Sequence, residues 1–280
     1  MKLLKQLFQF YINSSIHVAL SVFSLSWISL IEFQISYDAD VLYFIFFSSI
    51  TGYNFVKYFG IAKFHHRRLA KSLKAIQVFS FFSFLMLCYF TLKLNTVSLL
   101  YILGFGLVTF FYAIPFLPKR FFIDNQYNLR SISGLKVYLI ALVWSGVTVF
   151  LPLINNDHSI NLDVVLTGIQ RFVFIVVLMF PFEIRDLQYD SLKLGTIPQK
   201  IGVRWTKFIG VLLLVCFWIL EFFKNNLILN NLIVLGVIMV ITMLFLILSK
   251  KEQGPYFSSF FVEGIPILWL VILLLFNYFN

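Results

Sequence analysis

The sequence predicts an all-α integral membrane protein that forms a single transmembrane domain over residues 1–280. Hydrophobic residues make up 60% of the chain and charged residues only 12%, whereas a soluble domain carries about 45–50% apolar and about 25% charged residues. The apolar excess extends along the whole chain, so no segment has the composition of a separate soluble domain. Links rich in Lys and Arg also alternate with links poor in them, which is the pattern expected of cytoplasmic and external loops.

Nine apolar runs approach the length of about 20 residues that a helix needs to cross the hydrocarbon core of a bilayer. The fourth run ends where Pro115 and Pro118 interrupt the helical pattern, and the seventh run is short. Short polar links such as "SYDAD" and "KNN" separate consecutive spans. The predicted spans are 14–35, 41–62, 75–93, 97–116, 135–154, 164–183, 206–223, 227–248 and 260–279.

The positively charged residues indicate how these spans are oriented. All but four of the 22 Lys and Arg residues fall before the first span, or in or next to every second link after it, and cytoplasmic loops are the ones rich in Lys and Arg. The four exceptions are Lys57, Lys93, Arg171 and Lys224. We therefore expect a cytoplasmic amino terminus, a carboxyl terminus outside, and a net charge of +10 that reflects topology and not nucleic-acid binding.

Neither a secretory signal nor a disulfide or zinc site is predicted. Polar residues interrupt the apolar run behind Lys2 and Lys5, and no small-residue cleavage site follows, so we expect the first span to be retained. The two cysteines, Cys88 and Cys216, lie inside apolar runs, where Cys behaves as a small hydrophobe. No spacing of Cys and His suggests zinc.

The sixth span ends in "FEIRDLQYD", which gathers charge at the edge of the membrane. Glu183, Asp186 and Asp190 are spaced so that a continuing helix places all three on one face. Carboxylates suit Mg²⁺, which binds a few of them together with phosphate oxygens. The structural alternative is that these charges only mark the interface, with Arg185 paired to Asp186 or Asp190.

The basic residues that follow favour an anionic ligand. Lys193, Lys200 and Arg204 come soon after the carboxylates, and cations of this kind hold phosphate oxygens. The long links after the second, fourth and sixth predicted spans all lie on the predicted cytoplasmic side, and the last of them contains these residues. Long ordered loops usually carry function. The pattern therefore indicates a magnesium–diphosphate site at the cytoplasmic face.

The stretch "RDLQYDSLKLGTIPQKIG" resembles the second aspartate-rich motif of the UbiA superfamily of intramembrane prenyltransferases. Glu183 stands where many members have a further Asp, and "YAIPFLPKRFF" after the fourth span resembles the family's Tyr-x-x-Pro stretch before a basic loop. The residues that match the motif are Arg185, Asp186, Asp190, Gly195, Thr196, Pro198 and Gly202.

This resemblance covers most of the chain and implies a nine-helix bundle with its active site at the cytoplasmic face. Members of the family transfer an isoprenoid chain from its diphosphate to an acceptor. They hold Mg²⁺ against the diphosphate with two aspartate-rich motifs, on the second and sixth helices. Carried over to this chain, the resemblance implies Glu183, Asp186 and Asp190 as magnesium ligands, with Asp186 and Asp190 at the catalytic centre.

The first aspartate-rich motif is degenerate in this chain. Asn54 matches its start, but Phe55, Tyr58 and Ala62 occupy the three aspartate positions. Lys57, one turn after Asn54, could hold a diphosphate oxygen where relatives use a metal, so we expect one Mg²⁺ ion and not two. Alternatively, Lys57 snorkels to the interface and Asn54 forms hydrogen bonds between helices.

The function that we expect is transfer of an isoprenoid chain from a prenyl diphosphate to an unidentified aromatic or lipid acceptor. The alternative is a non-catalytic relative, a lipid-binding, transport or scaffold protein that kept the bundle and lost the chemistry, which the missing aspartates favour. Lys136 could reach a phosphate or could be an interface anchor. The residues expected to bind the diphosphate are Asn54, Lys57, Arg185, Lys193 and Lys136.

Two further charged residues lie within predicted spans. Arg171 belongs to the sixth span and Glu263 to the ninth. Charges at membrane depth usually have a partner, so we expect each of these residues to be a buried structural partner of the other, or of Glu32.

The predicted topology can be tested by cysteine labelling with a membrane-impermeant reagent. The basic residues place 63–74, 117–134 and 185–205 in the cytoplasm. A cysteine introduced at position 157 should therefore react from outside, and one at position 125 should not. The opposite pattern would put the carboxylates on the external face and contradict the predicted cytoplasmic site.

Overall fold

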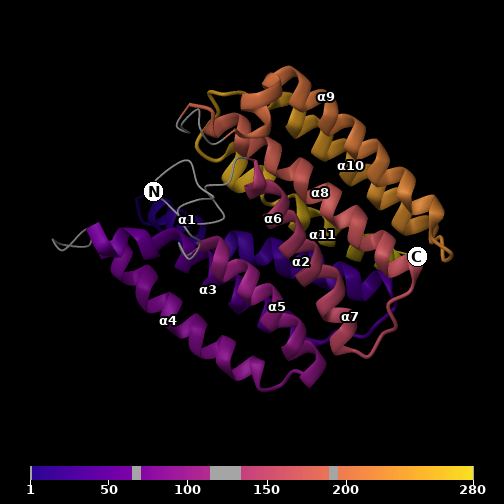
Figure 1. Cartoon of the computed structure of the whole chain (residues 1–280), viewed down its shortest axis with the longest axis horizontal. Helices are drawn as coiled ribbons and strands as arrows, with labels where there is room; N and C mark the ends of the chain where they lie inside the picture. The colour runs from indigo at the N-terminus through magenta and orange to yellow at the C-terminus, as the bar shows by residue number, and fades with distance from the viewer. Residues whose placement is uncertain (1, 65–70, 114–133, 189–194, 280) are drawn as a thin grey trace, which may run out of the picture.

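The computed structural model describes residues 2–64, 71–113, 134–188 and 195–279, and every element assigned in these ranges is a helix (Figure 1). The expected all-α class is confirmed. The elements are α1 (Lys2–Asn13), α2 (Ile16–Glu32), α3 (Ala39–Phe64), α4 (Lys71–Thr91), α5 (Thr96–Ala113), α6 (Leu135–Ser145), η3 (Gly146–Phe150), α7 (Leu151–Asn155), α8 (Leu162–Asp186), α9 (Ile197–Ile219), η5 (Leu220–Phe223), α10 (Leu229–Leu248), η6 (Phe257–Val262) and α11 (Ile265–Phe279).

Seven helical segments of the described chain are long and apolar enough to cross a membrane. The bent pair of α1 and α2 gives an eighth if it is one span, and the apolar part of α5, Thr96–Phe110, is shorter. The chain is therefore a multi-pass membrane protein, while the number of nine spans stays a prediction. The seven segments are Ala39–Tyr58, Leu73–Thr91, Leu135–Asn155, Leu162–Asp186, Ile197–Phe223, Leu229–Leu248 and Phe257–Tyr278.

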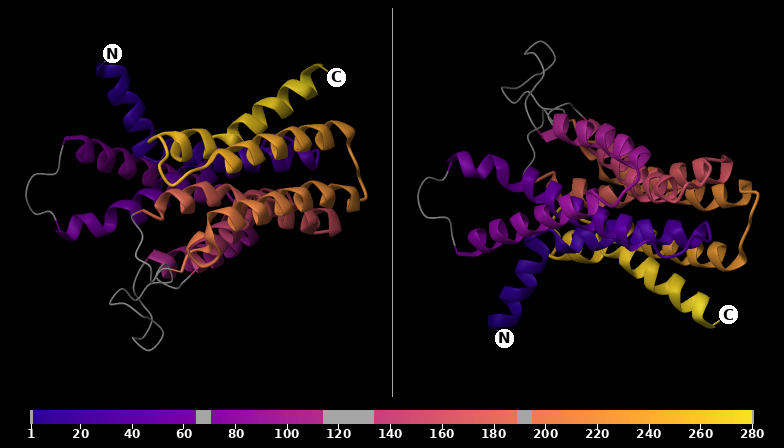
Figure 2. Two further views of the ribbon diagram at one scale, coloured as in Figure 1. Left: turned by 90° about the horizontal axis from the view of Figure 1, so that it is seen from above. Right: turned by 90° about the horizontal axis from the view of Figure 1, so that it is seen from below.

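The chain bends sharply between α1 and α2, where the sequence predicted only the start of a span. The two helices meet at 55°, and Ser15 between them has a φ of 63°, in the left-handed region that few residues other than glycine adopt. Leu3, Leu4 and Leu7 are largely exposed on α1, which diverges from the bundle in Figure 2. An exposed apolar face of this kind is typical of a helix that lies along a membrane surface.

The remaining helices pack around a core of aliphatic and aromatic side chains. Helix α2 contacts α3 and α11, α11 contacts α10, α10 contacts α9, and α9 contacts α8, which lies against α6. Helix α4 packs on α3 at one edge of the bundle (Figure 1). The beginning of α1 and the end of α11 lie towards opposite ends of the bundle (Figure 2).

One predicted span, 135–154, is built from three consecutive elements. The π-helix η3 joins α6 to α7, and Pro152 lies in the first turn of α7. Two glycines permit close packing around η3: a Cβ on Gly146 would lie 2.2 Å from the ring of Phe105, and one on Gly168 would lie 2.6 Å from the ring of Phe150. These contacts allow α5 and α8 to approach η3.

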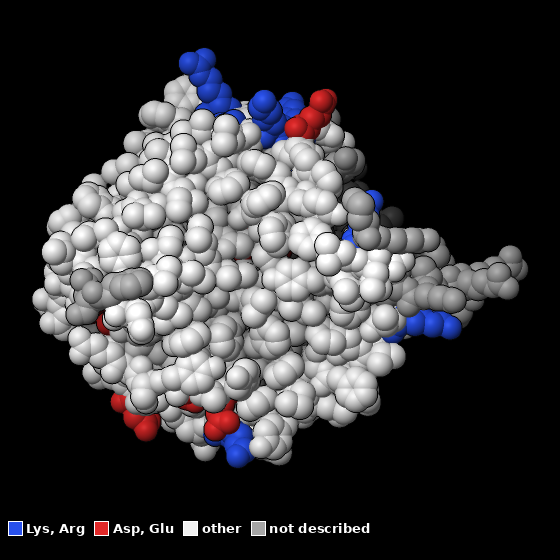
Figure 3. Space-filling model, turned by 180° about the vertical axis from the view of Figure 1, so that it is seen from behind, with Lys and Arg blue, Asp and Glu red and all other residues white. Residues whose placement is uncertain are grey.

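The charged side chains gather at the two ends of the bundle. Figure 3 shows most Lys and Arg side chains along the upper and right margins, most Asp and Glu side chains along the lower left, and a broad area almost without charge between them. At the acidic end, Asp38 accepts hydrogen bonds from the side-chain amides of Asn155 and Asn156, both at 2.9 Å. Asp163 accepts one from the backbone N–H of Asn225 at 2.9 Å.

Two ion pairs of the described residues are largely buried, Lys224 with Glu221 at 2.7 Å and Arg171 with Glu32. The guanidinium of Arg171, 1% exposed, is 4.0 Å from the carboxylate of Glu32, 3.4 Å from the hydroxyl of Ser29, and 4.7 Å from the ring centroid of Trp269. The sequence analysis expected Arg171 to pair with either Glu263 or Glu32, and the structure shows the pair with Glu32. Both cysteines are free thiols, as expected.

Replacing Arg171 by Met should lower the free energy of unfolding by about 3–5 kcal/mol, because Glu32 would be left as a buried charge without its guanidinium. Combining Arg171→Met with Glu32→Gln should recover most of that loss, since removing both charges is often nearly neutral. Thermal unfolding in detergent measures both effects, with Lys93→Ala as an exposed control. Equal losses in the single and double variants would show that the pair itself is not what stabilises the bundle.

Candidate functional site

The last turn of α8 carries two of the predicted metal ligands. Glu183 is 2% exposed, and its Oε2 accepts a hydrogen bond of 3.3 Å from the backbone N–H of Ile197, in the first turn of α9. The stretch that begins α9 has the residues that start helices: Thr196 is the N-cap, Pro198 lies in the first turn, and Gln199 Oε1 accepts from the N–H of Thr196 at 3.1 Å. The motif residues Thr196 and Pro198 thus begin α9, and the N–H of Ile197 between them joins this first turn to α8.

Asp186 is the carboxylate around which cations converge. Its Oδ1 accepts hydrogen bonds from Arg185, with Nε at 2.9 Å and a terminal nitrogen at 2.8 Å. The ammonium of Lys136, at the start of α6, lies 3.9 Å from Oδ2. The guanidinium of Arg185 also lies 5.4 Å from the ring centroid of Phe182. Arg185 therefore pairs with Asp186, as the structural alternative proposed, and Lys136 joins the same cluster from another helix.

A close backbone approach brings Lys136 and α9 together. Gly134, the residue before α6, has a φ of 75°, and a Cβ there would lie 3.3 Å from the carbonyl oxygen of Gly195 and 3.8 Å from the ammonium of Lys200. The segments that precede α6 and α9 thus meet beside the end of α8. Lys136, Arg185 and Lys200 supply three cations to this end of the bundle.

The remaining predicted ligands on this segment, Asp190 and Lys193, lie outside the described residues. The predicted set of Glu183, Asp186 and Asp190 therefore stays a prediction. Within the ranges that the structure describes, no three His, Cys, Asp or Glu side chains are grouped closely enough to hold a metal ion. Glu183 and Asp186 are hard oxygen donors on consecutive turns, the ligand type that Mg²⁺ prefers.

Asn54 forms hydrogen bonds that join three parts of the chain. Its side-chain amide donates to the carbonyl of Ser14 at 3.0 Å and to the hydroxyl of Ser80 at 2.8 Å, and its oxygen accepts from Ser15 Oγ at 2.8 Å. Asn54 is 3% exposed. These contacts are the interhelical hydrogen bonds of the structural alternative, and a role of Asn54 in binding the diphosphate stays a prediction.

Lys57 reaches the same junction between α1 and α2. Its ammonium donates to the carbonyl of Asn13 at 3.1 Å, an oxygen that also accepts from the hydroxyl of Tyr58 at 2.8 Å. The Lys57 side chain is exposed, and its role as a diphosphate ligand stays a prediction.

A pocket that the sequence did not predict lies beside Arg185. Arg185 and Gln188, at the end of α8, face the link between α10 and η6 across a hollow of about 470 Å³. That link is held in place by Gln253, whose amide donates to the carbonyl of Pro181 at 2.8 Å. The feature of the sequence that could have predicted this pocket is the stretch "KKEQGP", which combines charges of both signs with a Gly-Pro pair. The lining residues from the link are Lys251, Glu252, Gln253 and Pro255.

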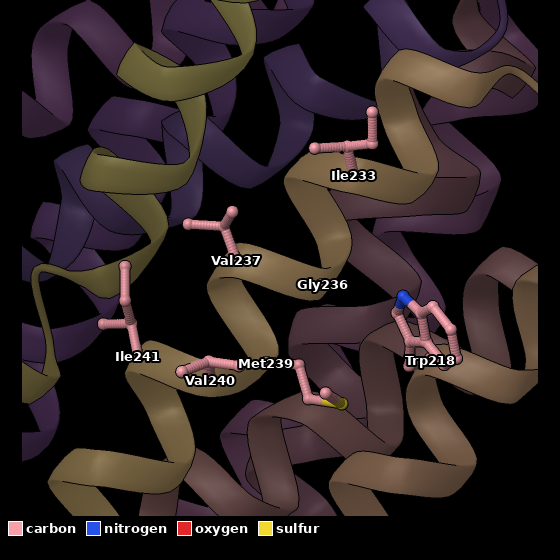
Figure 4. Close-up of a pocket in the computed structure, with 7 residues that line it drawn as sticks. All are labelled: Trp218, Ile233, Gly236, Val237, Met239, Val240 and Ile241. Atoms are coloured by element: carbon pink, nitrogen blue, oxygen red, sulfur yellow. The ribbon is translucent and has the colours of Figure 1, made fainter.

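A second hollow, of about 490 Å³, lies between α9 and α10, and its labelled lining residues are shown in Figure 4. Trp218 lines it from α9, and Gly236 faces that ring closely enough that a Cβ would lie 3.2 Å from the indole nitrogen. All of the lining residues are uncharged. This surface suits contact with hydrocarbon and offers nothing to hold a diphosphate.

The fold and the charged end of the bundle together define a class, a multi-pass helical membrane protein with a cluster of charged side chains at one end of the bundle. The chain is similar in structure to a solved membrane enzyme, digeranylgeranylglyceryl phosphate synthase, a prenyltransferase of the UbiA superfamily. The two chains superpose with a TM-score of 0.56 at 17% sequence identity, and the match covers 97% of each. The likeness of the fold to UbiA-type prenyltransferases is thereby confirmed. No family model and no curated protein matches the sequence.

Asn54→Ala should destabilise the junction between α1 and α2 by about 1–3 kcal/mol, because two hydroxyls and a carbonyl lose their buried partner. Thermal unfolding in detergent measures the loss. Thr51→Ala is the matched control, since Thr51 bonds only within α3, to the carbonyl of Phe47 at 2.8 Å. A loss no larger than that of the control would contradict the structural role of Asn54.

Proposed function

We propose that this chain is a membrane prenyltransferase, which transfers an isoprenoid chain from its diphosphate to an acceptor. The observation that carries the proposal is the convergence of Lys136, Arg185 and Asp186 at the end of α8, one turn from Glu183. A carboxylate surrounded by fixed cations can take part in binding both a metal ion and phosphate oxygens. The fold, shared with a solved prenyltransferase, supports the same activity.

Glu183, Asp186 and Asp190 are the residues that would hold Mg²⁺. Bound there, the ion would stabilise the negative charge that develops on the departing diphosphate. One ion is proposed and not two, because the only acidic residue of α3 is Asp40, at the opposite end of that helix. Lys57 would face the diphosphate from α3.

The chain's own cations would bind and orient the substrate. Arg185, Lys136 and Lys193 would hold diphosphate oxygens, which fixes the isoprenoid chain with its allylic carbon at the end of α8. As the bond between that carbon and the diphosphate oxygen breaks, the electron pair leaves with the diphosphate, and fixed positive charges lower the barrier. The nucleophile of the acceptor then bonds to the allylic carbon, and the proton that it carried is released to solvent. This face is proposed to be cytoplasmic, with the amino terminus inside and the carboxyl terminus outside.

A second candidate function is a non-catalytic relative that binds or transports lipid or serves as a scaffold. The contacts of Asn54 favour it, because both donors and the acceptor of the side chain are engaged with protein groups. The absence of acidic residues from α3 beyond Asp40 points in the same direction. Product analysis after incubation with prenyl diphosphates and candidate acceptors separates the two functions.

Asp186→Asn and Asp190→Asn should each weaken Mg²⁺-dependent binding of a prenyl diphosphate by about tenfold or more, because each removes a proposed metal ligand. Equilibrium binding of farnesyl diphosphate, with and without Mg²⁺, measures this in detergent. Asp157→Asn is the matched control, an exposed Asp in the link between α7 and α8 with a φ of 53° that Asn tolerates. If both variants bind as the parent does while remaining folded, these carboxylates are interface residues only.

A further inference from the structure

Helices α9 and α10 pack along a seam that has a polar contact near each end. The ammonium of Lys207 donates to the carbonyl of Ile247, near the end of α10, at 2.7 Å. Trp218 Nε1 donates to the carbonyl of Leu232, near the start of α10, at 3.4 Å. Lys207 and Trp218 are about three turns apart on α9, so both lie on the side of that helix that faces α10.

Basic residues gather at the end of the seam where Lys207 lies. Arg204 precedes Lys207 by about one turn of α9, and Lys250 comes directly after Ser249, which ends α10. The side chains of Arg204 and Lys250 are exposed. An ammonium has three donors, of which the carbonyl of Ile247 takes one, so Lys207 can also bind a further acceptor. This end of the seam therefore offers positive charge to an anion.

Exposed aromatic side chains place the same end of the seam at the membrane interface. Trp205 and Phe208 flank Lys207 on α9, and both are largely exposed. Their rings are in edge-to-face contact, with 5.7 Å between the centroids. Trp is enriched where its ring can lie at the level of the lipid headgroups. The ammonium of Lys207 is therefore at a depth where lipid phosphates are available.

An exposed apolar stripe runs along α10 from this end of the seam. Ile233, Val240 and Ile247 are exposed and recur every seven residues, so they share one face of the helix. Ile233 and Val240 also line the hollow of about 490 Å³ beside Trp218 (Figure 4). The stripe thus connects the carbonyl that Lys207 binds to the hollow.

The hollow lies at the depth that one lipid chain reaches. Gly236, which lines it, precedes Ile247 by about 16 Å along α10, at 1.5 Å per residue. One leaflet contributes about 15 Å of the hydrocarbon core. On its inner side the seam is closed, since a Cβ on Gly210 would lie 2.5 Å from the side chain of Leu246. A chain attached to a headgroup beside Lys207 would therefore lie on the outer surface and end in the hollow.

We propose that the seam between α9 and α10 binds one anionic phospholipid. Arg204, Lys207 and Lys250 hold the phosphate of its headgroup, and one acyl chain follows the exposed stripe of α10 into the hollow beside Trp218. Basic pockets between transmembrane helices bind anionic headgroups in this way. The bound lipid joins α10 to α9, the helix that begins at the candidate site. This inference is independent of the proposed function.

Lipid retention by the delipidated full-length protein tests the proposal. Dioleoyl phosphatidylglycerol and dioleoyl phosphatidylcholine carry the same chains on different headgroups, and native mass spectrometry counts the molecules retained from detergent. One phosphatidylglycerol should be retained in preference to phosphatidylcholine. Lys207→Gln, which keeps a donor for the carbonyl of Ile247, should weaken that binding about fivefold, equivalent to about 1 kcal/mol per basic residue. Lys74→Gln is the matched control, an exposed Lys on α4, and should change the binding by less than about twofold.

The hollow provides the second arm of the experiment. Val240→Trp fills it from an exposed position, and should weaken binding about fourfold for each methylene group displaced, equivalent to about 0.8 kcal/mol. Leu212→Trp is its control, because Leu212 is exposed on α9 outside the hollow. Dihexanoyl phosphatidylglycerol, whose chains are too short to reach the hollow, should bind weakly and equally to both variants. If Lys207→Gln does not fold, Lys250→Gln takes its place, since Lys250 is exposed beyond the end of α10.

Three outcomes would overturn the proposal. Equal retention of the two dioleoyl lipids, or equal effects of Lys207→Gln and Lys74→Gln, would show that the seam is ordinary lipid-facing surface. Tight binding of the dihexanoyl lipid that Val240→Trp does not change would show that no chain enters the hollow. Displacement of phosphatidylglycerol by farnesyl diphosphate would assign the seam to the prenyl substrate. Each of these results leaves the prenyltransferase proposal to its own test at Asp186 and Asp190.

Discussion

A charge inside a bilayer must have a partner or must reach the membrane surface, and the arrangement of this bundle follows from that constraint. The broad uncharged area of Figure 3 separates a mainly basic end from a mainly acidic one. Arg171, the buried charge in the middle of α8, is held by Glu32, Ser29 and the face of Trp269. At the ends, where helices stop, backbone and side-chain groups of neighbouring segments bind one another, as Asp38 and Asn54 do. The candidate site lies at one such end of the bundle, where positively charged side chains outnumber negatively charged ones.

Most of the helices could be predicted from the sequence, because hydropathy over about 20 residues reports directly on the span of a bilayer. The helix α1 was missed, since it is shorter, carries polar residues among its apolar ones and diverges from the bundle. The π-helices η3 and η6 were missed for a different reason. Composition does not distinguish a turn closed by an i→i+5 hydrogen bond from an α-helical turn.

The candidate site was predicted where its residues are close in sequence and missed where they are not. Glu183, Arg185 and Asp186 lie on one helical turn, so their spacing alone placed them together. From the sequence, Lys136 could either bind a phosphate or anchor its helix at the membrane interface. Its contact with Asp186 depends on the close approach of Gly134 to Gly195. Glu263 was expected to be a structural partner of Arg171 or Glu32, but the guanidinium of Arg171 pairs with Glu32 instead. Pairings of this kind depend on packing between elements far apart in the chain, which a single sequence does not contain.

The π-helix η6 has an evolutionary consequence. A turn closed by an i→i+5 hydrogen bond holds one more residue than an α-helical turn, and each residue rotates a helix by about 100°. A relative that lacks this extra residue would carry the side chain aligned with Glu263 on a different face of the helix. Divergence at this position would therefore proceed by insertion and deletion as well as by substitution, and comparison of aligned letters alone would not detect which lineages present this carboxylate on the same face.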